Sequence, residues 1–263
     1  MGTRQDAGGS PAEPEVTVDS EGPVLIVTLS RPHKRNAING AVTTQLAAAF
    51  DRLEADESLR VGVLTGAGGC FSSGADLRAG PAGEHLHDAH GFASLTRRRR
   101  NKPVIAAVEG AAYAGGFEIV LSCDIVVAAS DATFGLPEVK RGVLAGTGLY
   151  RLPRNIGFSV AAQIALTGDP IGAERAFGLG LVSALTEPGE ALPASVEMAR
   201  VIAANAPGSL RESLHVLRDS FGLDDDAAEQ LGREALRRLA GTSDFREGPR
   251  AFVEHRAPRW TGH

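Results

Sequence analysis

Short apolar runs of strand length recur along the chain. They are rich in β-branched residues and cover residues 24–29, 60–65, 103–108 and 124–129. Runs of this length, bounded by turn residues, are typical of buried strands. A turn of small residues follows two of them, Gly66-Ala67-Gly68-Gly69 after the second and Gly110 to Gly116 after the third. The pattern therefore predicts buried strands separated by tight turns and short helices.

Apolar residues spaced three and four apart predict amphipathic helices. Leu46, Phe50 and Leu53 recur in this way, and Thr43 or Thr44 is expected to cap their helix. A helix and a short strand are expected over residues 172–182. Two further apolar faces lie after Pro207, one made by Leu210, Leu214 and Leu217 and the other by Leu231, Ala235, Leu236 and Leu239. Because no strands remain for these helices to cover, residues 207–263 are predicted to form a separate helical region.

The segments beginning at Val61 and Pro103 share one plan, namely a buried strand, a turn of Gly and Ala, and a short helix. This loose internal repeat predicts a spiral of β-β-α units over residues 16–206. Residues 1–15 are rich in Gly, Pro, Ala and Ser and are predicted to form a disordered tail.

Composition narrows the class of protein. The 263 residues are 43% hydrophobic and 22% charged, which is typical of a soluble globular chain. A net charge of −5 does not favour a general role in binding nucleic acid or anionic membranes. The two cysteines suggest neither a disulfide framework nor a metal site, and no apolar run is long enough to cross a bilayer. We therefore expect a cytoplasmic protein.

The stretch from Lys102 to Glu138 carries the candidate chemistry. Gly115 and Gly116 have no Cβ, and their N–H groups are expected at a helix N-terminus, where developing negative charge is stabilised. Glu118 falls in the first turn of that helix. Two carboxylates that converge on such donors could hold a water molecule and move protons. The spacing leaves open whether the two glutamates meet, since a Glu in a first helical turn is most often solvated.

Four motifs occur in a specific order. They are Arg31-Pro32 with Asn36-Ala37, then Phe71 to Leu77, then Lys102 to Val108 with the glycine turn and Glu118, and finally Pro137-Glu138. Each is weak alone. In this order, and from about Val16 to the C-terminus, the chain resembles the enoyl-CoA hydratase/isomerase (crotonase) superfamily. The resemblance implies an α/β fold, the crotonase-like (ClpP/crotonase) spiral of β-β-α repeats, with a C-terminal helical region that mediates trimer contacts.

The resemblance also implies a mechanism. A hydratase of this superfamily adds water across the 2,3 double bond of a trans-2-enoyl-CoA, while the thioester oxygen accepts hydrogen bonds from the N–H groups matching Ala75 and Gly115. Glu118 and Glu138 would hold the water, with Glu118 favoured as its base and Glu138 as the proton donor to Cα. No metal or redox cofactor is expected, since coenzyme A is the carrier of the substrate.

Further positions follow from the resemblance. Those implied for CoA or substrate are Arg35, Ala37, Ser73, Asp76, Leu77, Tyr113, Pro137 and Leu144. Phe252 and Arg256 match positions that approach the CoA of a neighbouring subunit in a trimer or dimer of trimers. Arg35 and Arg78 are candidate phosphate partners, although exposed arginines beside turns are more often only solvated.

One loop departs from the commonest hydratase pattern. Leu144 replaces a proline and Tyr150 replaces a glutamine in the loop that borders the acyl pocket. The sequence therefore does not identify the acyl group of the substrate. Residues 137–142 also look like the carnitinyl-CoA dehydratase-like branch. An enoyl-CoA isomerase, which needs only one carboxylate, remains an alternative.

Two other features suggest different chemistry. The basic run Arg97 to Lys102 suggests RNA binding, but no aromatic residues are interleaved, and a solvated helix end before a strand is the simpler interpretation. His85, His87 and His90 lie in a polar stretch without completing a ligand set, so we reject a metal site and expect a mobile surface loop there.

Overall fold

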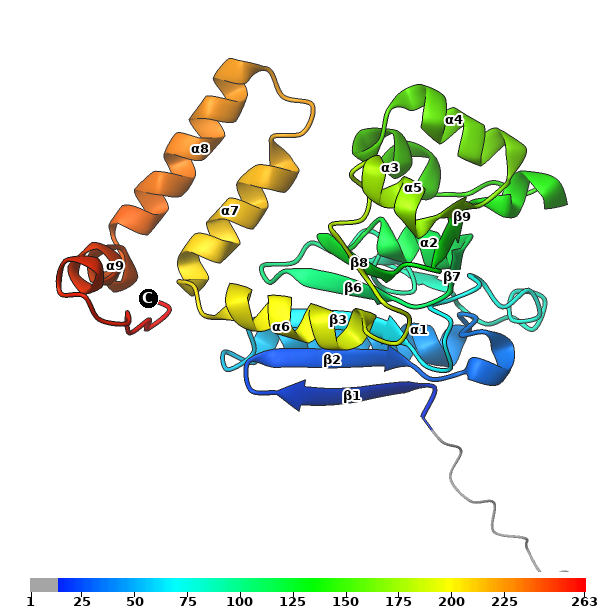
Figure 1. Ribbon diagram of the computed structural model, residues 1–263, viewed down its shortest axis with the longest axis horizontal. Coiled ribbons are helices and arrows are strands. Elements are labelled where there is room, and N and C mark those ends of the chain that lie inside the picture. Colours follow the sequence, from blue (N-terminus) through cyan, green and yellow to red (C-terminus); the bar gives the residue numbers. More distant parts are fainter. Residues whose placement is uncertain (1–13) are drawn as a thin grey trace, which may run out of the picture.

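A six-stranded sheet forms the base of the molecule (Figure 1). The computed structural model describes residues 14–263. The strands lie in the order β1 (Val16–Glu21), β2 (Val24–Leu29), β3 (Val61–Gly66), β6 (Val104–Val108), β8 (Ile125–Ala129) and β11 (Ala184–Thr186). β1 and β2 pair antiparallel, and the remaining neighbours are parallel. The four predicted strands are thus confirmed as β2, β3, β6 and β8.

Both faces of the central strands are buried, which explains their uninterrupted apolar sequences. Val61, Val63 and Ile105 pack on one side with residues of α6 (Ala191–Ala203). Leu64 and Val104 point to the other side, into the larger core. In Figure 1, α6 lies along the sheet beside β3. Because successive side chains of a strand point to opposite faces of the sheet, each strand contributes to two separate hydrophobic cores.

A second, smaller sheet continues the spiral. It contains β7 (Ala111–Tyr113), β9 (Thr133–Gly135) and β10 (Ile171–Gly172), and β7 and β9 follow directly on β6 and β8 along the chain. β7 and β9 pair in parallel, with Tyr113 opposite Gly135. Each of these two buried strands therefore leads into a short strand that starts the next layer.

Several short elements lie at the β7–β9 end of the sheet. They are η1 (Pro32–Lys34), α2 (Gly115–Val120), η2 (Pro137–Arg141), α3 (Gly148–Asn155), α4 (Phe158–Thr167) and α5 (Ala173–Gly178). Figure 1 shows α3, α4 and α5 grouped above β7 and β9. This end carries the candidate site.

Three expectations for local structure were wrong. The cap of α1 (Gly40–Ala55) is Asn39, whose Oδ1 accepts a hydrogen bond from Val42 N at 2.9 Å, whereas Thr43 and Thr44 lie inside the helix. No helix follows β3; residues 67–103 form turns with the short strands β4 (His87–Asp88) and β5 (Gly91–Phe92), because Pro81 and several glycines interrupt any helix there. The strand expected at residues 181–182 begins at Ala184 instead.

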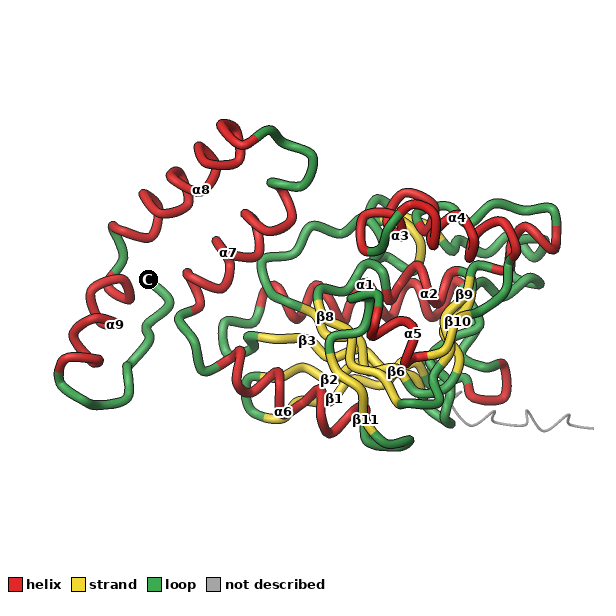
Figure 2. The backbone as a smooth tube through the Cα atoms, turned by 45° about the horizontal axis from the view of Figure 1, so that its top comes forward, coloured by secondary structure: helices red, strands yellow, loops and turns green. Residues whose placement is uncertain are grey.

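The C-terminal helices form an arm that projects from the sheet (Figures 1 and 2). The arm consists of α7 (Pro207–Asp219), α8 (Asp225–Ala240) and α9 (Ser243–Val253). Large apolar side chains are exposed on it, among them Leu217, Leu236, Phe245, Phe252 and Val253. Among the described helices, none has the length and apolarity that crossing a bilayer requires. The tail expected over residues 1–15 falls, apart from Pro14 and Glu15, outside the described residues.

Candidate active site

The two segments that carry the predicted oxyanion donors lie against each other. Ile38 N donates to Gly74 O, and Asp76 N donates to Ile38 O, both at 2.8 Å, so Ala75 between them turns its own N–H away from this pairing. A Cβ built on Gly74 would lie 2.8 Å from the Gly115 nitrogen. Within residues 14–263, neither the Ala75 N–H nor the Gly115 N–H donates a hydrogen bond. Two free donors are thus brought to one place.

Close backbone packing explains the glycines of this turn. A Cβ on Gly115 would lie 2.5 Å from the ring of Phe92, and one on Gly116 would lie 2.3 Å from the carbonyl oxygen of Ser72. Ala114, the residue before α2, has φ +51° and ψ −128°, a conformation that L-residues rarely adopt. The turn is therefore held in one conformation by contacts on both sides.

Glu118 lies in the first turn of α2 with only 7% of its surface exposed. Its Oε1 accepts a hydrogen bond of 2.7 Å from the N–H of Gly148, the first residue of α3. The first N–H groups of a helix have no partner inside the helix, so they are available to a carboxylate. A Cβ on Gly146 would lie 3.3 Å from the same oxygen. The glycines before and at the start of α3 therefore leave room around the carboxylate.

Glu138 comes to the same place from η2, directly after β9. Its buried Oε2 has no hydrogen-bond partner within the described chain. Burial raises the pKa of Glu138, and the nearby charge of Glu118 raises it further, against the opposing effects of its own N–H and of Arg141. The structure therefore brings the two glutamates close enough for the charge of Glu118 to act on Glu138, and it shifts the pKa of Glu138 upward. Such a pair can take a proton at one carboxyl group and release one from the other.

The residues implied for CoA lie on two adjoining segments. Ser73 N donates to Arg35 O at 3.0 Å, which continues the pairing of Ile38 with the segment around Ala75. Arg35 is exposed, and Ala37 is buried beside it. On the second segment Asp76 forms an ion pair with Arg31, whereas the side chain of Leu77 is 75% exposed and that of Arg78 is also exposed.

The remaining predicted residues are more scattered. The hydroxyl of Tyr113 lies 2.9 Å from Thr133 Oγ1, and Pro137 is the first residue of η2. Leu144 and Tyr150 are both exposed on the loop and helix that follow η2. The altered loop therefore presents apolar side chains beside the segment that carries Glu138.

The structure does not bring Phe252 and Arg256 to the site of their own chain. Phe252 is 82% exposed on the arm, and the arm projects away from α2 (Figure 1). Arg256 forms hydrogen bonds of 2.6 and 2.9 Å to the two carboxylate oxygens of Glu247. These bonds, with the hydrogen bond to Glu254, raise the pKa of Arg256, and the Arg256 bonds with the N–H of Arg259 lower the pKa of Glu247 to about 2. The Arg256 guanidinium is therefore already occupied inside the arm.

A buried polar network supports the two CoA segments, and reasoning from sequence missed it. Asn36 donates through Nδ2 to the carbonyl oxygens of Ala67 and Cys70 at 2.9 and 2.6 Å. Ser72 Oγ donates to Asn36 O at 2.8 Å, and Arg31 N donates to Asn36 Oδ1 at 2.9 Å. Arg31 and Asn36 were visible as motif residues, but nothing in their spacing indicated these partners.

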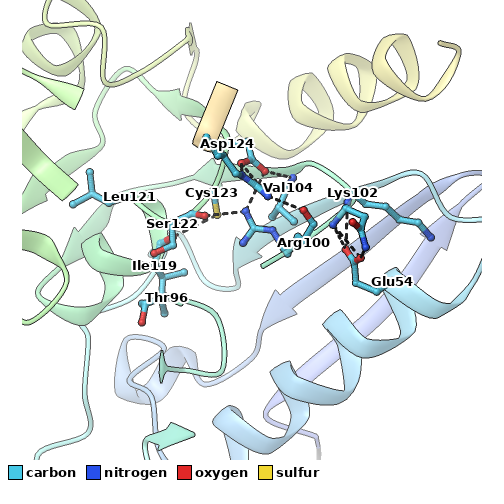
Figure 3. Close-up of polar contacts among 12 residues, drawn as sticks. Glu54, Thr96, Arg100, Lys102, Val104, Ile119, Leu121, Ser122, Cys123 and Asp124 are labelled. Atoms are coloured by element: carbon cyan, nitrogen blue, oxygen red, sulfur yellow. Dashed lines mark hydrogen bonds and ion pairs between the residues drawn. The ribbon is translucent and has the colours of Figure 1, made fainter. Parts of the chain in front are cut away.

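Only part of the basic run is solvated: Arg97 and Arg99 are exposed, whereas Arg98 and Arg100 are buried. No helix ends there, so the interpretation as a solvated helix end was wrong for the helix and for the buried residues. In Figure 3, Arg100 points toward Asp124 and the backbone of Ser122; its Nη2 lies 3.1 Å from Asp124 Oδ2 and 2.9 Å from Ser122 O. Lys102 donates to the carbonyl oxygen of Leu53 at 2.6 Å, near the end of α1. Burial excludes Arg100 from any exposed basic patch.

The histidine stretch forms a small hairpin of β4 and β5 rather than a ligand cluster. His85 and His87 are exposed, and the His87 ring lies tilted at 56° to the Phe92 ring, with the two ring centroids 5.3 Å apart. In the part of the chain that the structure describes, no three His, Cys, Asp or Glu side chains are placed to hold a metal ion.

Comparisons with known proteins give the family. A family model described as enoyl-CoA hydratase/isomerase matches residues 19–263. Mevalonyl-coenzyme A hydratase sidH of Aspergillus fumigatus is 40% identical over 90% of this chain and 91% of that protein. Enoyl-CoA hydratase EchA19 of Mycobacterium tuberculosis is 38% identical over 94% of this chain and 96% of its own.

A solved structure agrees with these relatives. The crystal structure of an enoyl-CoA hydratase from Mycobacterium tuberculosis H37Rv superposes with a TM-score of 0.93 at 45% identity, and the match covers 95% of this chain and all of that one. The predicted crotonase fold is therefore confirmed. This chain belongs to the enoyl-CoA hydratase/isomerase family and is an enzyme of the hydratase (lyase) type.

Proposed function

We propose that this enzyme adds water across the 2,3 double bond of a trans-2-enoyl-CoA by means of Ala75, Gly115, Glu118 and Glu138. The observation that carries this proposal is the meeting of two carboxyl groups beside two unpaired backbone N–H groups. A site that stabilises an oxyanion and holds two proton-transferring groups matches the chemistry of adding water to a conjugated thioester.

The thioester oxygen accepts hydrogen bonds from the Ala75 and Gly115 N–H groups. Negative charge grows on this oxygen as water attacks Cβ, and each preorganised donor lowers the barrier by about 3 kcal/mol. Glu118 takes a proton from the attacking water, and protonated Glu138 delivers a proton to Cα. The upward shift in the pKa of Glu138, caused mainly by burial, supports this division, because it makes this carboxyl group hold a proton more readily than a solvated glutamate does.

The CoA moiety is proposed to lie along the segments around Ala37 and Asp76. Their pairing presents backbone groups in a row, and the exposed side chains of Arg35 and Arg78 stand at its edge as candidate phosphate partners. Leu77, Pro137 and Leu144 are proposed to border the substrate. CoA serves as the carrier of the acyl group, and the proposed steps use no other cofactor.

The exposed side chains of the arm support a proposal about assembly. Its exposed apolar side chains favour burial against another copy, as a trimer or a dimer of trimers. In such an assembly Phe252 would approach the CoA of a neighbour, whereas Arg256 would first have to leave Glu247.

The cysteines support a proposal about the compartment. Cys70 and Cys123 are both free thiols, which supports a reducing compartment such as the cytoplasm.

Isomerisation is the nearest alternative. It needs one carboxyl group to move a proton between two carbons of the acyl chain. The second glutamate, with its unpartnered and buried Oε2, favours a water molecule as the additional reactant. We therefore propose hydration in preference to isomerisation.

The test follows the ultraviolet absorbance of crotonyl-CoA, which is lost when water adds to the conjugated double bond. Wild-type protein is expected to remove the absorbance, and both Glu118→Gln and Glu138→Gln are expected to slow its loss by at least about a hundredfold. Glu229→Gln, which changes an exposed glutamate of α8, is the matched control and should retain full activity. Unchanged activity in either active-site variant, with folding intact, would contradict the proposed roles.

A further inference from the structure

Arg31 is a buried guanidinium that joins the two CoA segments from behind. Only 7% of its surface is exposed. Its Nη1 donates to the carbonyl oxygen of Ala37 at 2.6 Å, and its Nη2 lies 3.2 Å from Asp76 Oδ2. Its Nε forms an ion pair with Glu15 at 3.0 Å. One side chain therefore links the chain entering β1 with both segments of the site.

Asp76 transmits this contact to the proposed oxyanion donor. Asp76 is the next residue after Ala75, and its own N–H is bonded to Ile38 O. The peptide that carries the Ala75 N–H therefore lies between Gly74, paired to Ile38 N, and a carboxylate fixed by Arg31. A shift of Asp76 changes the direction of that N–H group.

The opposite charges of Arg31 and Asp76 hold the two side chains together. A buried guanidinium that loses its carboxylate partner is strongly unfavourable, so the pair resists separation. The N–H of Arg78 lowers the pKa of Asp76, and Arg31 adds to this effect, so Asp76 stays ionised near neutral pH. Asp76 is thereby fixed in both position and charge.

The Gly115 donor is held in a different way. Contacts with Phe92 and the Gly74 segment fix its backbone, and no ionic side chain takes part in these contacts. The two halves of the donor pair therefore depend on different interactions. Within residues 14–263, an ion pair supports the Ala75 half alone.

We propose that Arg31 is a positioning residue that sets the direction of the Ala75 N–H through Asp76. The inference rests on the proposed oxyanion role of Ala75 and deepens it. Lysine cannot replace arginine here, because a single ammonium group cannot reach Ala37 O, Asp76 and Glu15 at once. The reaction is expected to slow because preorganised donors act only when correctly aligned with the oxyanion.

The first measurement is the kinetics of Arg31→Lys and Asp76→Asn with crotonyl-CoA. Each variant is expected to lose roughly tenfold to a hundredfold in kcat, the range that small misplacements of reacting groups cause, with a smaller change in KM. Arg98→Lys is the matched control, since Arg98 is also buried and bound to a carboxylate, that of Asp51, outside the proposed site. It should lose stability while keeping kcat.

The second measurement needs no turnover. A cinnamoyl-CoA with an electron-donating para substituent absorbs at longer wavelength when its carbonyl is polarised by hydrogen bonds. Bound to wild-type protein it should show a red shift, which Arg31→Lys and Asp76→Asn should reduce and Arg98→Lys should retain. This readout works even if the chain does not hydrate crotonyl-CoA, so failure of the proposed activity and failure of the positioning role can be told apart.

Two outcomes would overturn the proposal. In the first, Arg31→Lys binds the probe with the wild-type red shift and shows unchanged kcat despite lower stability, which would make Arg31 purely structural. In the second, KM rises while kcat and the red shift stay at wild-type values, which would limit Arg31 to binding CoA. If Arg31→Lys does not fold, Asp76→Asn supplies the same comparison.

Discussion

The N–H of Gly148 donates a 2.7 Å hydrogen bond to Glu118 Oε1 and so joins two helices across 30 residues of sequence. Gly148 is the first residue of α3, and Glu118 lies in the first turn of α2. No donor within residues 14–263 contacts the other oxygen, Oε2. The carboxylate is therefore anchored through one oxygen, and the other is available to a water molecule.

Space next to this carboxylate is expected to limit the reaction. A methyl group at Gly146 would lie 3.3 Å from Oε1 and 3.9 Å from Oε2 of Glu118, where it would crowd the attacking water. Gly146→Ala should therefore lower kcat for crotonyl-CoA by about tenfold or more. Gly157→Ala is the matched control, because a Cβ there would meet no atom within 4 Å. Equal kcat values for the two variants would contradict the assigned crowding.

The raised pKa of Glu138 predicts a pH dependence of stability. Burial, with the charge of Glu118, raises this pKa above its ordinary value of 4.5, so the folded protein holds the proton more tightly than the unfolded chain. The contribution of Glu138 to the free energy of unfolding therefore falls as pH rises from about 4.5 through the raised pKa. Glu138→Gln removes this loss and should be more stable than wild type near pH 7.

Urea unfolding at several pH values tests the sign. The advantage of Glu138→Gln over wild type should shrink toward about pH 4, where the carboxyl group is protonated in both the folded and the unfolded state. Glu229→Gln, on the exposed face of α8, should show no such trend. An advantage that grows toward low pH would show that the assigned direction of the shift is wrong.

The sequence predicted the two glutamates but not their meeting, and the reason is strand register. Tyr113 pairs with Gly135 in the parallel strands β7 and β9, so Glu118 and Glu138 leave the same end of the small sheet within a few residues. Strands of three residues carry no periodic signal that could reveal such a register. The buried strands of the large sheet, by contrast, were readable because their apolar runs are continuous.

Long-range partners explain what was misread around the basic run. Arg100 pairs with Asp124, 24 residues away, and the Arg218 guanidinium of α7 donates to the same carboxylate. Charge density along the sequence suggested solvation, since it says nothing about a carboxylate that returns from another strand. The position of the run before β6 was correct, whereas the helix expected there and the solvated environment of Arg98 and Arg100 were wrong.

Asp124 is expected to be a principal electrostatic contact between the sheet and the arm. Asp124→Asn would leave the guanidiniums of Arg100 and Arg218 without their shared carboxylate, and Arg100 is almost fully buried. Loss of one partner from a buried ion pair costs about 3 kcal/mol of unfolding free energy, which urea unfolding would detect. The exposed pair of Glu229 and Arg233 provides the comparison, and Glu229→Gln should cost under about 1 kcal/mol. Similar losses for the two variants would contradict the assigned burial.

Ala114 stores backbone strain directly before the Gly115 donor. Its φ of +51° with ψ of −128° is a glycine-like conformation, which costs an L-residue about 1–3 kcal/mol. Ala114→Gly releases that strain and loses up to about 1 kcal/mol through the greater freedom of the unfolded chain, so its free energy of unfolding should rise by about 1 kcal/mol. Ala204→Gly, at an exposed position with φ −71°, has no strain to release and should instead be destabilised. Thermal and urea unfolding of both variants decide the matter, since equal destabilisation would mean that Ala114 is not strained.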